Sequence, residues 1–106
     1  MIVIENIALF TGHADHYYPA GSVLIEGNLI RFAGPREARP ELSPDTTVVD
    51  GKGAFLMPGM VESHAHLSYT NNGPLELDKS PVEEVMIKTI NNARIMLGSG
   101  FTAADQ

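Results

Sequence analysis

One strong helical pattern, with a strand pattern before it and the start of another after it, constrains the fold of this chain more than any other feature. Residues 81–97 carry apolar side chains at helical spacing. The apolar positions are Val82, Val85, Met86, Ile90, Ala93 and Leu97. Strand patterns lie at residues 60–66 and 101–106. A strand, a helix and a strand in this order begin a parallel α/β sheet or barrel, which needs more strands than this chain supplies.

The ends of the predicted helix carry their own signals. Ser80 can cap the first turn, Pro81 suits the first helical position, and Glu83 completes a capping-box pattern with Ser80. Gly98 and Gly100 predict the end of the helix, because glycine readily adopts the backbone conformation that closes many helices.

The residues before this unit read as β-structure. A hairpin pattern at residues 21–34 is the clearest, with strands on either side of Gly27-Asn28, a dipeptide that tolerates the positive φ of a tight turn. Residues 1–10 are rich in isoleucine and contain no proline, which predicts another strand.

Turn signals divide the rest of this β-region. Residues 35–45 contain three prolines and mixed charges, and read as a loop. Residues 46–50 predict a strand, and two glycines after it predict a turn before a separate short strand, AFLM. A Pro-Gly dipeptide then interrupts the pattern. We therefore expect a β-domain at residues 1–56 and a second domain at residues 57–106.

Composition limits the classes of function. The 106 residues carry a net charge of −6, which argues against nucleic acids and anionic membranes as partners, since both need a basic surface. The absence of cysteine excludes disulfides and thiolate metal sites, so a metal would need histidine, carboxylate or carbonyl ligands. The N-terminus lacks the basic region of a signal peptide, and no apolar run approaches the roughly 18 residues of a membrane span. We expect a cytoplasmic protein.

Two histidines, His64 and His66, stand one residue apart after an apolar run. Side chains at i and i+2 of a strand point to the same side, so a strand would project both imidazoles together, as two ligands of one metal require. On spacing alone, two surface histidines remain an equal alternative. The other two histidines flank Asp15 in a segment that reads as a solvated loop without a buried platform for a metal (His13 and His16).

The residues around the pair resemble the entry segment of the amidohydrolase superfamily. The elements that match it are Pro58, Gly59, Met60-Val61, Glu62, His64 and His66. The hairpin is similar to the family's N-terminal β-sandwich, and NARIMLGSGFT is similar to its first barrel helix leading into the second strand. The imidazolonepropionase-like and prolidase-like branches are the most similar. Two departures are a glutamate at position 62, where aspartate is commoner, and AADQ after GFT, where the family usually continues with a threonine, an aliphatic residue and Arg-Asp.

The resemblance implies a mixed α/β fold: a small N-terminal β-sandwich followed by the first strand-helix unit of an incomplete (β/α)8, or TIM-type, barrel. It also implies a site at the C-terminal face of that barrel, where His64 and His66 bind a divalent metal, zinc by default, as one ion or two. A metal-activated water would hydrolyse a C–N bond, amide or cyclic amide, of a small-molecule substrate.

The remaining ligands of the family come from later strands: a lysine, two histidines and an aspartate. None lies in this chain, so we expect no catalytic residue in the segment and little activity from it alone. Glu62 is expected to support the barrel floor or to hydrogen-bond behind the ligands. Tyr69 and Asn71, in the first loop after the strand, are candidates for contact with substrate.

Three hypotheses follow. The chain is part of a metal-dependent hydrolase that a complementing chain or a homo-oligomer completes, or a non-catalytic fragment or interaction module, or a simple metal-binding module. A partner with the missing ligands would favour the first. An exposed apolar face on the helix at 81–97, with no such partner, would favour the second, and metal retention without any partner would favour the third.

Overall fold

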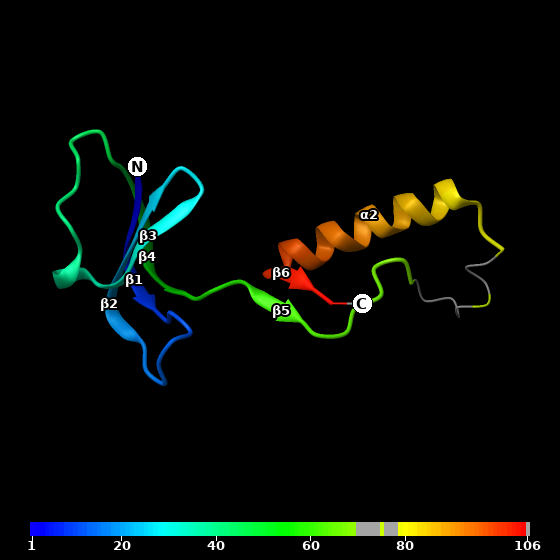
Figure 1. Cartoon of the computed structure of the whole chain (residues 1–106), viewed down its shortest axis with the longest axis horizontal. Coiled ribbons are helices and arrows are strands. Elements are labelled where there is room, and N and C mark those ends of the chain that lie inside the picture. Colours follow the sequence, from blue (N-terminus) through cyan, green and yellow to red (C-terminus); the bar gives the residue numbers. More distant parts are fainter. Residues whose placement is uncertain (70–74, 76–78, 106) are drawn as a thin grey trace. The chain divides into compact units, whose positions relative to one another are not determined.

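The computed structural model of this chain describes residues 1–69, 75 and 79–105. The chain forms two compact units, Met1–Pro58 and Gly59–Gln106 (Figure 1). The division falls within the Pro-Gly dipeptide that interrupts the strand patterns of the sequence. Each unit has its own sheet, and the elements of each are considered separately.

The first unit is built on one four-stranded sheet in the order β3-β2-β1-β4. Its strands are β1 (Ile2–Leu9), β2 (Tyr18–Glu26), β3 (Leu29–Pro35) and β4 (Thr47–Leu56). β1, β2 and β3 pair antiparallel, whereas β4 joins the far side of β1 in parallel. The described residues of this unit form a single layer of four strands. The sequence predicts part of a β-sandwich here, and a second layer of such a sandwich does not lie among these residues.

The predicted hairpin is confirmed. β2 and β3 pair from Gly21–Pro35 to Glu26–Leu29, and the turn between them holds Gly27 at a φ of 60°. That left-handed conformation is available to glycine without steric cost, which explains why a tight turn forms at this dipeptide. Arg31 also donates from Nε to the carboxylate of Glu26 at 2.7 Å.

Strand β4 differs from the prediction, which divided it into two strands at Gly51 and Gly53. The structure instead has one strand with an irregularity: Glu5 pairs with Asp50 and Ile7 with Ala54, so three residues of β4 stand opposite a single residue of β1. Parallel pairing with β1 resumes after this bulge with the register shifted by two residues, and β4 therefore continues as one strand.

The connection from β3 to β4 crosses one face of the sheet, because these strands lie at opposite edges. It includes the short 3-10 helix η1 (Arg36–Ala38), which the loop prediction did not include. Arg39 donates from its guanidinium to the carboxylate of Glu5 on the central strand β1, and Arg36 lies 3.3 Å from the other oxygen. Thr47 then donates from its backbone N–H to the carbonyl of Met1 at 3.0 Å, where β4 begins.

The core of the first unit lies on the central strands β1 and β2. Ile7, Leu9 and Val23 form a buried cluster, against which four further apolar residues pack. These are Ile4, Tyr18, Ile25 and Leu56. Burial of aliphatic side chains is the dominant stabilising term in a sheet of this size, so the two central strands hold the unit together.

The second unit is a strand-helix-strand unit, as predicted. It consists of β5 (Met60–Glu62), the helix α2 (Val82–Gly98) and β6 (Phe101–Ala104). β5 and β6 pair in parallel, with Met60 opposite Phe101 and Glu62 opposite Ala104. Parallel neighbours need a long crossover between them, and α2 supplies it.

The start of α2 differs from the predicted capping box. Pro81 is the cap rather than the first helical residue, with a ψ of 142°, and among the described residues no side chain caps the helix. Because the helix begins one residue later than expected, Glu83 becomes its second residue and does not reach back to the N–H of Ser80. The end is as expected: Ser99 donates from its backbone N–H to the carbonyl of Ile95, and Gly100 has a φ of 97°.

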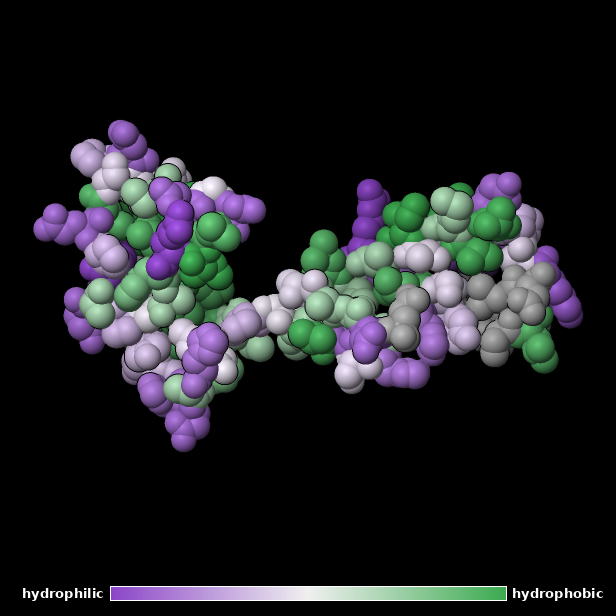
Figure 2. Space-filling view, in the orientation of Figure 1, coloured by the Kyte–Doolittle hydropathy of each residue, from purple (hydrophilic) through white to green (hydrophobic). Residues whose placement is uncertain are grey.

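Much of the predicted apolar face of α2 is exposed, and the helix has no buried residue among those described. Met86, Ile90 and Leu97 each keep more than half of their surface accessible. Figure 2 shows apolar residues along this element. The half-buried positions of the helix include Val85 and Ala93 from the predicted apolar face, together with Lys88, Thr89, Asn92 and Met96. The face that contacts the rest of the unit is therefore rotated from the most apolar one.

Among the described residues, no helix is long and apolar enough to cross a membrane.

Candidate metal site

The two histidines lie beyond the end of β5, not on it as predicted. The strand ends at Glu62, and His64 and His66 follow in an irregular segment. Backbone pairing with the other strand continues through Asp105, which donates to the carbonyl of Glu62 at 3.0 Å and accepts from the N–H of Ala65 at 2.9 Å. Because Asp105 is bonded to both Glu62 and Ala65, the residues after β5 stay beside the end of β6, although they are not part of a regular β-ladder.

The two imidazoles nevertheless converge. The Nε2 atoms of His64 and His66 lie 3.1 Å apart, with the ring planes at 87° and the centroids at 4.8 Å. In the neutral state one Nε2 can donate to the other, or both can present lone pairs to one ion. Two nitrogens bound tetrahedrally at about 2.0–2.1 Å from zinc lie roughly 3.4 Å apart, so the observed separation fits a shared ion.

The other expected residues lie close to the pair but act on it in different ways. The side chain of Glu62 accepts from the backbone N–H of His64 at 3.2 Å, so it holds the main chain and not the ring. Tyr69 stacks on the ring of His66, with centroids 4.4 Å apart and planes at 16°, and its N–H donates to the carbonyl of His66 at 3.0 Å. Asn71 lies outside the described residues.

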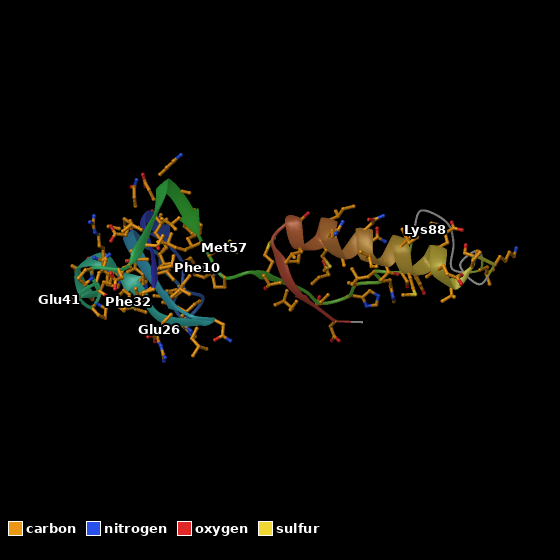
Figure 3. All side chains as sticks on the ribbon, turned by 90° about the horizontal axis from the view of Figure 1, so that it is seen from above. Phe10, Glu26, Phe32, Glu41, Met57 and Lys88 are labelled. Atoms are coloured by element: carbon orange, nitrogen blue, oxygen red, sulfur yellow. The ribbon has the colours of Figure 1, made fainter. Side chains whose placement is uncertain are left out.

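Sequence reasoning missed one residue of this site, Asn92. Its side-chain amide reaches from α2 to the carbonyls of Leu67 and Tyr69, at 2.7 and 2.9 Å. In Figure 3 the ribbon of α2 runs alongside the segment that follows β5, in keeping with these two hydrogen bonds. One sequence signal could have indicated this residue. Asparagine is a poor helix former, so an asparagine in the middle of a predicted helix suggests that its amide binds a group outside the helix.

The second histidine cluster remains a loop. His16 lies 3.6 Å from Asp15, and both side chains are exposed, as expected for a solvated segment. In the part of the chain that the structure describes, no three His, Cys, Asp or Glu side chains come together as a metal site would require. His64 and His66 thus fit a zinc ion as two of its ligands, whereas a catalytic zinc generally has three protein ligands and a water.

Comparisons with known proteins address the family directly. No family model matches the chain. It is 39% identical over 71 residues to a 5-methylthioadenosine/S-adenosylhomocysteine deaminase of Symbiobacterium thermophilum, a match that covers 65% of this chain and 16% of that protein. It is 37% identical over 78 residues to an imidazolonepropionase of Arthrobacter sp., covering 72% of this chain and 19% of the relative.

The similar solved structures indicate the same family as these relatives. A crystal structure of an amidohydrolase superposes with a TM-score of 0.84 at 26% identity, over 97% of this chain and 24% of that one. The chain belongs to the amidohydrolase superfamily. A prolidase complexed with N-methylphosphonate-L-proline, at 23% identity and a TM-score of 0.82, supports the fold alone. The family resemblance of the sequence is therefore confirmed, and the chain spans less than a fifth of the length of these two curated relatives.

Proposed function

We propose that this chain is the part of a metal-dependent amidohydrolase that supplies two ligands, His64 and His66, to a divalent ion. The observation that carries the proposal is the convergence of the two Nε2 atoms, 3.1 Å apart. The relatives support the reaction class, since deaminases and imidazolonepropionase are enzymes that hydrolyse C–N bonds. The proposed reaction is hydrolysis of such a bond in a small molecule.

The chain's own residues hold and orient the ligand pair. A bound zinc would lower the pKa of a coordinated water towards neutrality and polarise the scissile bond. Both imidazoles must be neutral at Nε2 to bind it, which places their remaining protons on Nδ1. Glu62 holds the backbone of His64, and Tyr69 packs against the ring of His66, so each ligand has a separate support.

The remaining ligands and the general base must come from outside the described residues. We propose that β5, α2 and β6 form the first strand-helix-strand unit of a (β/α)8 barrel. Parallel pairing of β5 with β6, and the similarity to an amidohydrolase chain about four times as long, support this assignment. The rest of the barrel would belong to a longer form of this protein, to a complementing chain or to a homo-oligomer.

A second candidate function is a non-catalytic interaction module. The exposure of Met86, Ile90 and Leu97 on α2 favours it, because large apolar side chains on a helix commonly mark a contact surface. The two proposals differ in what they require of the histidines, since an interaction module needs no metal at this site.

Zinc titration of the full chain tests the metal proposal. His64→Ala and His66→Ala should each weaken zinc binding by about tenfold or more, since even groups behind a ligand contribute that much. His13→Ala, in the exposed loop, is the matched control and should leave affinity unchanged. NMR signals of the His64 and His66 rings should shift during the titration. Equal affinity in all four proteins, or no shift of these rings at saturating zinc, would remove the metal site and leave the interaction module.

A further inference from the structure

We propose that Asn92 is a positioning residue, whose side-chain amide holds the segment after the histidine pair and thereby aims the ring of His66 at His64. This inference rests on the proposed function, in which the two rings share a metal. Asn92 itself has no contact with either imidazole among the described hydrogen bonds, so its effect passes through the backbone of its partners.

Asn92 uses both hydrogens of its amide on this segment. Nδ2 donates to the carbonyl of Leu67 at 2.7 Å and to that of Tyr69 at 2.9 Å. A primary amide nitrogen has two N–H donors, so this nitrogen is fully engaged by two carbonyls of one loop. The two bonds span 25 and 23 residues of sequence and tie the middle of α2 to the residues that follow the site.

The fixed segment reaches His66 through Tyr69. The N–H of Tyr69 donates to the carbonyl of His66 at 3.0 Å, which closes a turn from 66 to 69. The Tyr69 ring then stacks on the His66 ring at a centroid distance of 4.4 Å. Moving the Tyr69 backbone therefore moves the surface on which the His66 ring rests.

This support is needed because no sheet orients His66. The strand ends at Glu62, and the last backbone bond to the neighbouring strand's end is the one from Ala65 to Asp105. His66 is also exposed, so close packing from all sides does not fix its rotamer. Of the described contacts, stacking by Tyr69 and the 3.1 Å approach of His64 are those that restrain its ring.

The helix offers a matched control. Asn91 is exposed, whereas Asn92 is half-buried, and both are asparagines with the same helix propensity. Asn92→Ala removes the two donors. Asn92→Asp keeps the shape of the side chain but replaces the amide nitrogen by a carboxylate oxygen, which cannot donate to the two carbonyls. This variant therefore separates the loss of the hydrogen bonds from a change in side-chain volume. Asn91→Ala repeats the change of residue type without touching the loop.

The experiment measures the full chain by NMR and by zinc titration, with circular dichroism to check α2. The His66 ring signals, assigned with His66→Ala, should carry the upfield shift of a ring stacked on tyrosine. In Asn92→Ala and Asn92→Asp that shift should collapse towards the value of a free histidine, and zinc affinity should fall about tenfold. Asn91→Ala should change neither, and the helical signal should be equal in all variants.

Two results would overturn the proposal. One is an unchanged His66 ring shift in both Asn92 variants. The other, measured in the unaltered chain and so independent of whether the variants fold, is exchange of the Asn92 side-chain amide protons as fast as those of Asn91. If the unaltered chain binds no zinc but the ring shift still depends on Asn92, the metal proposal fails while the positioning role stands.

Discussion

Asp50 shows how a single residue organises the irregular pairing between β1 and β4. Its carboxylate accepts from the N–H of Lys52 at 2.8 Å and from the side-chain amide of Asn6 at 2.8 Å. Both donors belong to residues with positive φ, 53° for Lys52 and 54° for Asn6. These two bonds hold the pKa of Asp50 below its usual value of 3.8, the bond from Lys52 contributing most.

We expect Asp50→Asn to flatten the acid dependence of stability. Because the folded pKa lies below the unfolded one, the ionised carboxylate stabilises the fold above about pH 5, and that contribution is lost as pH falls through the lowered folded pKa. The urea midpoint of the unaltered chain should therefore fall more steeply between pH 5 and pH 2.5 than that of the variant. Glu41→Gln removes the same charge from an exposed loop and should not reproduce the flattening.

At the scale of elements, the contact between β5 and β6 depends on a residue without a side chain. A Cβ added to Gly59 would lie 2.2 Å from both Cγ2 and Oγ1 of Thr102 and 2.7 Å from its Cβ. Thr102 lies on β6, and rotation about its χ1 cannot relieve the overlap, because its Cβ stays in place at 2.7 Å. The two strands can therefore approach this closely only with glycine at position 59.

We expect Gly59→Ala to destabilise the second unit by about 1–3 kcal/mol, the usual cost of overpacking. Urea titration followed by the helical signal of circular dichroism reports on this unit, since α2 is the long helix of the described chain. Gly98→Ala is the control: no atom lies within 4 Å of the added Cβ, and alanine should raise helix stability by up to about 1 kcal/mol. A Gly59→Ala midpoint equal to or above that of the unaltered chain would contradict the close contact.

At the scale of the whole molecule, the two units differ in how much they bury. The first has Val3, Ile7, Leu9, Val23 and Leu24 at 5% exposure or less. Among the described residues of the second, Ala65 is the one buried apolar side chain. Since apolar burial is the main term that opposes conformational entropy, the second unit has much less to hold it folded.

We expect the backbone amides of α2 to exchange with solvent faster than those of the central strands. Hydrogen exchange of the full chain should show protection factors in β1 and β2 at least tenfold above those in α2, because local opening follows the density of buried contacts. Raising urea should abolish protection in α2 first. Equal protection in both units, lost together, would show instead that they unfold as one cooperative body.

Local sequence signals determined several features of this protein. The β2–β3 hairpin follows from Gly27-Asn28 between two strand patterns, and the end of α2 follows from Gly100, because turn and cap conformations depend on a few adjacent residues. The family, now confirmed, was readable from the residues around His64 and His66 because those motifs are contiguous in the chain.

The tertiary structure decided the features that depend on contacts between residues distant in sequence. β4 is one strand because β1 pairs with it on both sides of the bulge and Asn6 of β1 donates to Asp50 at the bulge. The residues of β4 alone do not reveal which strand lies beside them. β5 stops at Glu62, so the approach of His64 to His66 comes from contacts beyond the strand rather than from strand geometry. Asn92 lies at the site because the face of α2 that carries it contacts residues 67–69. Helical periodicity alone does not predict which face of a helix makes such a contact.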